Sequence, residues 1–241
     1  AGDQGAGGIG AGAINEGIAS VNIGTSGVVF SSSESYKYDA LGRLHSFCHA
    51  VPGKWHVMGV MLSAGGSLRW FRDALGEPER SVALLTGEDV YDFLTKEAQS
   101  APPGSEGLIF LPYLSGERTP HGDPNARGVF FGLSLNHRKA HIIRSILEGV
   151  AFGLKDSTEI MKEIGIAINE FRVVGGGSKS PLWRQILAGV FDHAVYTMAV
   201  DEGSSYGAAI LASVAAGGGS KAGRKYWRSD RAVGGRQSFV R

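Results

Sequence analysis

Three short glycine-rich segments hold the residues whose types and spacing point to chemistry. They lie at 2–10, 24–27 and 175–178 of a chain in which 37 of 241 residues are glycine, about twice the usual share of roughly 7%. Clustered glycines permit tight turns and let backbone N–H groups approach a ligand closely, and phosphate is the ligand most often found there. Together the three segments predict a nucleotide held between glycine-rich turns.

Asp3 is a carboxylate near the start of the first segment, and it fits two roles. As an N-cap it would accept hydrogen bonds from the first N–H groups of a helix, and as a general base it would take a proton from a substrate hydroxyl. The same segment holds a formal G-x-G-x-x-G at Gly5–Gly10, but a dinucleotide fingerprint needs a preceding strand and an acidic residue about 20 positions later. Glu16 and Glu34 stand at poor spacings, so close helix packing explains these glycines equally well.

The other two segments differ in what surrounds them. Gly24–Gly27, with Thr25 and Ser26 between the glycines, interrupts an apolar stretch. It would either cradle a phosphate with its N–H groups and hydroxyls or form a simple hairpin turn. Gly175–Ser178 lies between a predicted strand and a predicted helix, where the partial positive charge of a helix N-terminus favours a nucleotide. It lacks the Gly-Lys-Ser/Thr ending of a P-loop, so that class of NTPase is excluded.

The composition excludes several classes of protein. Hydrophobic residues make up 43% of the chain and the formal net charge is +1, which excludes disorder for most of it. No apolar run approaches the ~20 residues that cross a bilayer, and the single cysteine, Cys48, excludes a disulfide framework. We therefore expect a soluble, cytoplasmic protein. His137 and His141 lack the intervening Glu of a zinc-protease helix, and no metal ligand is predicted.

Residues 220–241 differ from the rest of the chain in charge. They hold seven basic side chains against Asp230 alone, a net charge of +6, which leaves −5 for the other residues. They follow Gly217–Gly219 and have no helical or strand periodicity. A basic arm of this kind suits nucleic-acid binding, but we favour a disordered or non-native extension.

The elements that must position the glycine-rich segments alternate between strands and helices. Periodicity and turn signals predict helices at 3–15, 63–75, 88–99, 138–164, 181–191 and 205–216. Strands are predicted at 19–23, 28–31, 45–51, 56–61, 108–114, 171–174 and 195–200. Ser180 is the expected N-cap of the helix that begins at Pro181. This order predicts an α/β domain with a mixed sheet.

The order of these segments resembles the FGGY family of carbohydrate kinases. The polar stretch Ser115–Pro120, followed by Asp123–Gly128, is similar to the xylulokinase branch of that family, as are Leu147–Ala151 and Ser180–Gln185. The resemblance covers residues 1–217 and ends at the basic tail.

The resemblance implies a ribonuclease H-like/actin-like ATPase domain, with a mixed five-stranded sheet flanked by helices. Residues 1–217 would be the C-terminal nucleotide-binding domain of a two-domain sugar kinase, and 218–241 a basic tail that is disordered or non-native. The chain begins inside a motif without an initiator Met, so we expect a fragment. The family's N-terminal domain, with the first phosphate loop and most of the sugar pocket, would be absent.

The resemblance also implies roles for single residues. Asp3 would be the general base toward a sugar hydroxyl, and Gly24 and Thr25 would form the second phosphate loop. The adenine-ribose site would be lined by Gly176, Gly177 and Ser178. ATP would be bound with Mg²⁺, and phosphoryl transfer suits this arrangement because positioning and charge stabilisation do most of the catalysis.

The expected activity is ATP-dependent conversion of D-xylulose to D-xylulose 5-phosphate by the two-domain enzyme, with this chain alone binding nucleotide but catalytically incomplete. Two alternatives stay open: a kinase for glycerol, ribulose or gluconate, and a nucleotide-binding module without catalysis. The expected partners are the sugar, ATP and the missing N-terminal domain, with homodimer formation left open. Neither a membrane nor nucleic acid is an expected partner.

Overall fold

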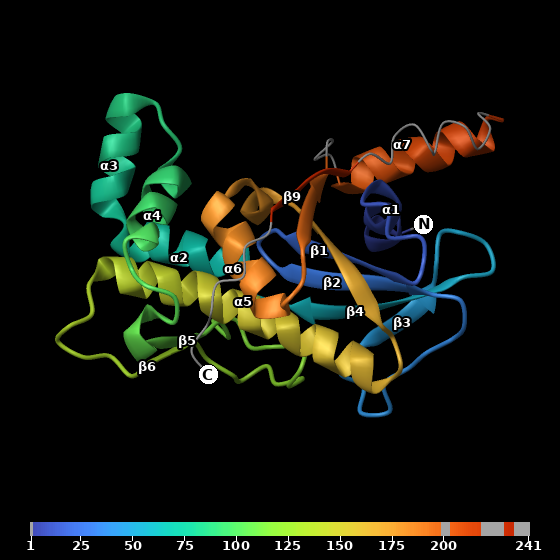
Figure 1. Ribbon diagram of the computed structural model, residues 1–241, viewed down its shortest axis with the longest axis horizontal. Coiled ribbons are helices and arrows are strands. Elements are labelled where there is room, and N and C mark those ends of the chain that lie inside the picture. The colour runs from blue at the N-terminus through green and yellow to red at the C-terminus, as the bar shows by residue number, and fades with distance from the viewer. Residues whose placement is uncertain (1, 199–202, 218–228, 234–241) are drawn as a thin grey trace.

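A sheet of seven strands forms the centre of the fold, with helices on both of its faces (Figure 1). The computed structural model describes residues 2–198, 203–217 and 229–233. The strands of the sheet are β1 (Gly17–Ile23), β2 (Gly27–Ser33), β3 (His45–Cys48), β4 (Trp55–Met61), β7 (Ile168–Val174), β8 (Val195–Met198) and β9 (Ser229–Val233). Their order is β3-β4-β2-β1-β7-β8-β9. The sheet is mixed, because β1–β7 and β7–β8 are parallel and the other pairs are antiparallel.

The helices lie on two faces of the sheet and at one end of the molecule. Their bounds are α1 (Asp3–Gly10), α2 (Gly65–Leu75), α3 (Glu77–Thr86), α4 (Val90–Gln99), α5 (Lys139–Glu163), α6 (Pro181–Phe191) and α7 (Gly203–Ala215). Figure 1 shows α5 along one face, with α2 and α6 beside it, and α1 against α7 on the other face. α3 and α4 stand together at one end. No helix in the described part of the chain has the length and apolar character needed to cross a membrane.

Alternation along the strands gives the two faces different interiors. In β1, Ala19, Val21 and Ile23 join the large apolar core that α5 covers. Ser20 and Asn22 lie on the α1 face, because successive side chains of a strand point to opposite faces. The α5 face of β1 is therefore apolar, and its α1 face carries polar groups.

Local signals in the sequence predicted several helices correctly. The helices expected at 63–75, 88–99 and 138–164 correspond to α2, α4 and α5. At the start of α6, Ser180 Oγ accepts the Trp183 N–H at 3.3 Å, as expected for an N-cap. The helix expected at 3–15 is shorter, because α1 ends at Gly10.

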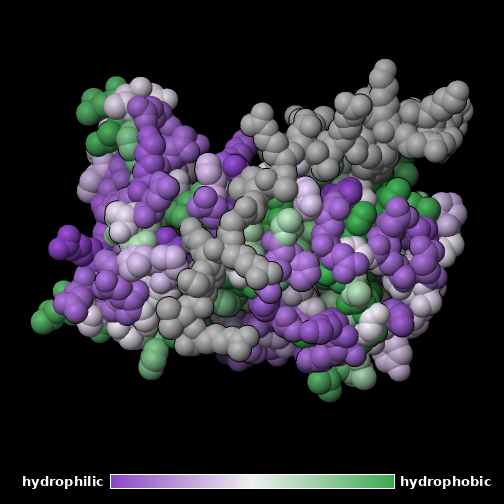
Figure 2. All heavy atoms as spheres, in the orientation of Figure 1, coloured by the Kyte–Doolittle hydropathy of each residue, from purple (hydrophilic) through white to green (hydrophobic). Residues whose placement is uncertain are grey.

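The sequence does not predict α3 or β6 (Val129–Phe131). α3 buries no residue fully, and Figure 2 shows apolar side chains at its far end, where Leu84 and Leu85 are exposed. It therefore lacks the core-facing apolar stripe that reveals a helix. β6 is only three residues long and pairs with β5 (Ile109–Leu111) in a separate small sheet, and runs this short give no clear periodicity.

The sheet is wider than the five strands expected. It has seven strands, with β3 at one edge and β9 at the other. β9 falls in the basic tail, where the composition predicts disorder, yet residues 229–233 pair with β8, with Val233 opposite Val195. An edge strand offers unpaired N–H and C=O groups, and β9 satisfies those of β8. The expectation that the tail is disordered or non-native stays a prediction. The rest of the tail, like residues 199–200 of the last predicted strand, lies outside the described residues.

The polar loop at 115–128 is structured, and part of it lies along the free end of β4. The Leu62 N–H donates to Glu117 Oε1 at 2.9 Å. Thr119 bonds Val60 twice, through its N–H at 2.9 Å and its Oγ1 at 3.0 Å. Burial raises the pKa of the Glu117 carboxyl. Backbone and side-chain groups of the loop thus take the place of a strand partner beyond the end of β3.

Candidate functional site

Two of the three glycine-rich segments lie side by side beyond the carboxyl ends of two central strands of the sheet. β1 and β7 are parallel neighbours, with Asn22 opposite Val174, so the segments that follow them leave the sheet at the same edge. Gly175 has a φ of +85°, and a Cβ there would lie 2.5 Å from Asn22 Oδ1 and 2.9 Å from the Ile23 carbonyl oxygen. A glycine is therefore needed for this close approach, which brings the two segments into contact.

These segments border a cleft of about 700 Å³ between α2, α4 and α6. Gly24, Thr25, Gly176 and Gly177 all line it. The structure thus brings together four of the five residues predicted to bind a nucleotide. The volume is within the range of pockets that hold cofactors and other small molecules, about 300–1,000 Å³.

Ser178, the fifth residue, supports the turn instead of lining the cleft. It is buried, and its Oγ donates to the Gly175 carbonyl at 2.7 Å. The turn is a 3₁₀ segment, η2 (Gly176–Lys179), and it leads directly to Ser180 at the N-terminus of α6. Because Ser180 lines the cleft, the partial positive charge of that helix end borders it.

The Gly24–Gly27 segment is a hairpin turn that also forms part of the cleft wall. It joins β1 to its antiparallel neighbour β2, and the start of α2 holds it, since the Gly65 N–H donates to the Gly24 carbonyl at 2.8 Å. Thr25 is exposed and lines the cleft. The hairpin alternative is confirmed, and phosphate binding by the same turn stays a prediction.

Helices α2 and α4 supply a wall that sequence analysis missed. Arg72 donates to Tyr91 Oη at 2.9 Å and pairs with Asp73 at 2.7 Å. Arg69 is exposed one turn earlier, and within the described residues its side chain makes no ion pair or hydrogen bond. Lys179 is exposed on the side of η2. The wall also holds three acidic side chains, Asp73, Asp89 and Asp92. Free cationic groups beside open glycine backbone suit an anionic ligand such as a phosphate.

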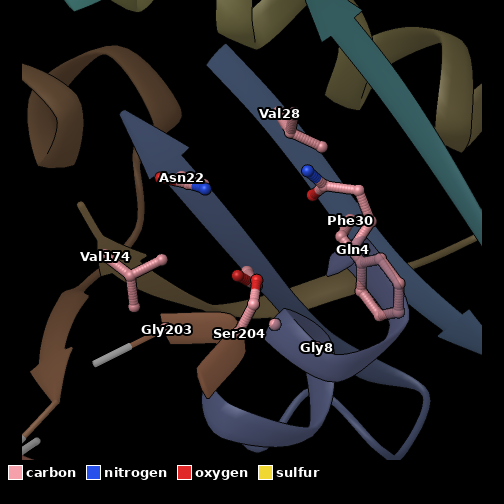
Figure 3. Close-up of a pocket in the computed structure, with 10 residues that line it drawn as sticks. Gln4, Gly8, Asn22, Val28, Phe30, Val174, Gly203 and Ser204 are labelled. Carbon is pink, nitrogen blue, oxygen red and sulfur yellow. The ribbon is translucent and has the colours of Figure 1, made fainter. Parts of the chain in front are cut away.

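A second, much smaller pocket opens at the same edge on the other face of the sheet. Figure 3 shows Gln4 from α1, Asn22 from β1 and Ser204 from α7 around one space. Ser20, which is buried, and Phe30 complete its polar and apolar sides. The pocket measures about 20 Å³, enough for about one water molecule.

Asp3 lies next to this small pocket and does not cap α1. The N-cap residue is Gly2, no side chain caps the helix there, and Asp3 is the first helical residue. Asp3 is therefore not the N-cap residue, although its Oδ1 accepts the Gln4 N–H at 2.8 Å from the first helical position. Asp3 is exposed, and Ser204 Oγ donates to the Asp3 carbonyl at 2.8 Å, which fixes the start of α1 against α7. The general-base role stays a prediction.

Gly10, at the end of the first segment, serves helix packing against α7, as does Gly207 on α7 itself. A Cβ on Gly10 would lie 2.3 Å from the Gly203 carbonyl oxygen, and one on Gly207 would lie 1.7 Å from the Ala6 carbonyl oxygen. The backbones of α1 and α7 therefore touch, which no larger residue at these positions permits. The formal G-x-G-x-x-G lies inside a helix and not in a strand-to-helix turn, so it is not a dinucleotide fingerprint.

Buried histidines lie on the α1 face, farther from the cleft. The His56 ring stacks on Phe30 with 4.5 Å between ring centroids, and His49 Nε2 lies 3.3 Å from the Ala13 carbonyl oxygen. Burial, with the nearby His49 adding to it, lowers the pKa of His56 to about 4. Within the described residues no group of three His, Cys, Asp or Glu side chains is placed to hold a metal ion.

Comparison with known proteins identifies the family. A model of the FGGY family of carbohydrate kinases, C-terminal domain, matches residues 19–216, so the chain belongs to this family. The xylulose kinase of Escherichia coli (strain K12) is 42% identical over 216 residues, which cover 89% of this chain and 42% of that protein. The gluconokinase of Bacillus subtilis (strain 168) is 40% identical over 211 residues, covering 87% of this chain and 41% of that protein. The chain thus spans about two fifths of the length of these relatives.

Solved structures of this family share the fold. A ligand-bound xylulose kinase from Lactobacillus acidophilus superposes with a TM-score of 0.81 at 31% identity, over 95% of this chain and 45% of that one. The expected class, an actin-like α/β domain with a mixed sheet flanked by helices, is confirmed.

Proposed function

We propose that this chain is the C-terminal, nucleotide-binding domain of an ATP-dependent sugar kinase that converts D-xylulose to D-xylulose 5-phosphate. The observation that supports it most is the joint lining of one cleft by two glycine-rich turns, at Gly24–Thr25 and Gly176–Gly177. Asp3 begins α1 at the same edge of the sheet. The similarity to a xylulose kinase supports the choice of sugar.

The cleft suits one orientation of a bound ATP molecule. The adenine and ribose would lie beside Gly176 and Gly177, and the phosphates would pass over Gly24 and Thr25. A Cβ on Gly176 would meet nothing within 4 Å, so its backbone is open to the nucleotide, and the N-terminus of α6 favours negative charge there. Arg69 adds a free positive charge to the wall. Mg²⁺ neutralises phosphate charge when it arrives with ATP, and we assign no residue of this chain to it.

Asp3 would act as the general base. Its carboxylate takes the proton from the sugar hydroxyl, the hydroxyl oxygen bonds to the γ-phosphorus, and the bond from that phosphorus to the β-phosphate oxygen breaks, releasing ADP. A positioned general base contributes about 10²- to 10⁴-fold to a rate. The contact between Ser204 Oγ and the Asp3 carbonyl supports this role, because it holds the first turn of α1 in place.

The missing part of the enzyme is the expected partner. The chain covers 42% of the xylulose kinase to which it is similar, and we propose that an N-terminal domain closes over the cleft and supplies most of the sugar pocket. The chain alone would bind nucleotide without phosphorylating a sugar. Gluconate is the alternative acceptor with specific support, because a gluconokinase is 40% identical.

The test uses the chain extended to the length of its relatives. ADP release is measured with Mg-ATP and, in turn, D-xylulose, L-ribulose, glycerol and gluconate. Release that depends on D-xylulose supports the proposal. Release with another member keeps the kinase and changes the substrate, and no release with any member favours the module without catalysis.

A second measurement uses the 241-residue chain. Isothermal titration with ADP and Mg²⁺ is expected to show binding, and incubation with ATP and the same four sugars is expected to give no phosphorylated product. A confirmed turnover by this chain would contradict its proposed incompleteness.

A further inference from the structure

Asn22 lies at the point where the two pockets meet. The large cleft is lined by Ile23 and Gly24, and the small pocket on the other face is lined by Asn22. This follows from the strand itself, because successive side chains point to opposite faces. The carboxyl end of β1 is therefore the rim that a ligand crosses when it passes from the cleft toward Asp3.

The backbone of the segment after β7 lies close to the Asn22 side chain. Gly175 approaches so closely that a Cβ there would lie 2.5 Å from Asn22 Oδ1. Asn22 is half-buried, and within the described residues its amide makes no hydrogen bond. A polar group without a partner has its full hydrogen-bonding capacity available to a ligand.

The neighbours of Asn22 show which part of a nucleotide would reach it. Gln4, the residue after the proposed base, lines the same small pocket (Figure 3). The turn at Gly24 and Thr25 begins two residues after Asn22 along the chain. A phosphate chain that starts at the cleft and ends at Asp3 passes Thr25 first and Asn22 last. The group nearest Asn22 is thus the one that is transferred.

We propose that Asn22 is a further residue of the site, and that its side-chain NH₂ donates a hydrogen bond to the terminal phosphoryl group of ATP. This inference rests on the proposed function. ADP lacks the terminal group, so the amide distinguishes the two nucleotides. Because hydrogen bonds to charged groups are worth about 1.5–3 kcal/mol, loss of this one lowers affinity for the triphosphate about tenfold or more.

The test is isothermal titration of the 241-residue chain with Mg²⁺ and either ADP or the non-hydrolysable analogue AMP-PNP. Asn22→Asp keeps the shape but replaces the donor with a negative charge, and Asn22→Ala removes the group. Both variants are expected to bind AMP-PNP at least tenfold more weakly than the unaltered chain, with ADP affinity changed less than about threefold. Asn136→Ala removes an exposed amide that does not line the cleft and is expected to change neither affinity.

The outcomes separate this inference from the proposed function. Suppose that the unaltered chain binds both nucleotides, and that the Asn22 variants either bind both equally more weakly or bind both unchanged. In either case the contact with the terminal phosphoryl group is wrong, while the nucleotide site stands. If the unaltered chain binds neither nucleotide, the proposed function fails and this inference fails with it. Circular dichroism and thermal melting identify any variant that does not fold, and the inference is then decided by the other variant.

Discussion

On the side of the sheet where the cleft lies, Gly176 borders open space, whereas on the face that α1 and α7 cover Gly207 touches another helix. A Cβ on Gly176 would meet nothing within 4 Å, and one on Gly207 would lie 1.7 Å from a backbone oxygen. The same residue type therefore leaves room for a ligand in one place and lets two helices pack in the other. What decides between these roles is the element opposite the glycine, which only the fold supplies.

The two faces also differ in what they bury. The α5 face holds the main apolar core. The smaller cluster on the α1 face consists of Ala13, Val28, Phe30 and Val60, with His49 and His56 buried beside it. Because apolar burial is the main stabilising contribution, the α5 face stabilises the domain more, and the α1 face is left to position Asp3 at the sheet edge.

The largest expected effect is on the proposed base. In the full-length enzyme, Asp3→Asn is expected to lower kcat about 10³-fold, because the variant cannot accept the hydroxyl proton, while ATP affinity changes little. Steady-state kinetics with titration of the nucleotide checks both. A loss of kcat smaller than about tenfold would limit the α1 face to a structural role.

The next effect tests helix packing on the α1 face. Gly207→Val is expected to lower the free energy of unfolding by about 3 kcal/mol, because the added side chain must displace the Ala6 carbonyl. Ala208→Val, an exposed position on the same helix, is the matched control, with a cost of about 0.5 kcal/mol. Urea denaturation measures both. An equal loss of unfolding free energy in the two variants would show that the packing of α1 against α7 does not depend on this contact.

A pair of neighbouring glycines sharpens the contrast within the cleft. A Cβ on Gly177 would lie 2.5 Å from Ile23 Cγ2, so Gly177→Val is expected to cost about 1–2 kcal/mol of stability. Gly176→Val has free space, so we expect unchanged stability and about tenfold weaker ADP binding, equal to about 1.4 kcal/mol, because the side chain occupies the cleft. Thermal melting and titration with ADP check the pair. Unchanged ADP affinity in Gly176→Val would remove this turn from the nucleotide site.

The smallest expected effect concerns the buried histidines. The pKa of His56 falls from 6.5 to about 4 in the folded chain. Between these values the unfolded chain binds a proton that the folded chain does not, so stability falls as the pH falls through this range. His56→Phe is expected to reduce the drop in Tm between about pH 7.5 and about pH 5. His121→Gln, at an exposed histidine, is the control, and an equal drop in all three proteins would contradict the assignment.

The parts that could be predicted from sequence are those specified by neighbours along the chain. Ser180 followed by Pro181 defines the start of α6, and the spacing of apolar residues defines α5. The turns at Gly24 and Gly176 could be found in the same way, because glycine clusters between a strand and the next element are local signals. Four of the site residues that were predicted from these signals line one cleft in the structure.

The parts that could not be predicted depend on contacts between distant segments. Arg69 and Tyr91 line the cleft only because α2 and α4 pack beside it, and nothing in their own helices indicates that direction. The close approach of Gly175 to the Asn22 side chain likewise joins residues that are far apart in the sequence. The N-cap alternative for Asp3 was wrong by a single residue, since the helix begins after Gly2, and helix ends are the least certain feature of a sequence pattern.

The contact between Ser204 and Asp3 joins residues that are 201 positions apart, and this separation has a consequence for the order of folding. Closing so long a loop costs entropy before any contact repays it, and pairings of this kind slow folding. At about 5–20 residues per second of synthesis, α1 waits on the order of tens of seconds for its packing partner. The helix that presents Asp3 is made before α7, and it reaches its final position only after α7 has left the ribosome.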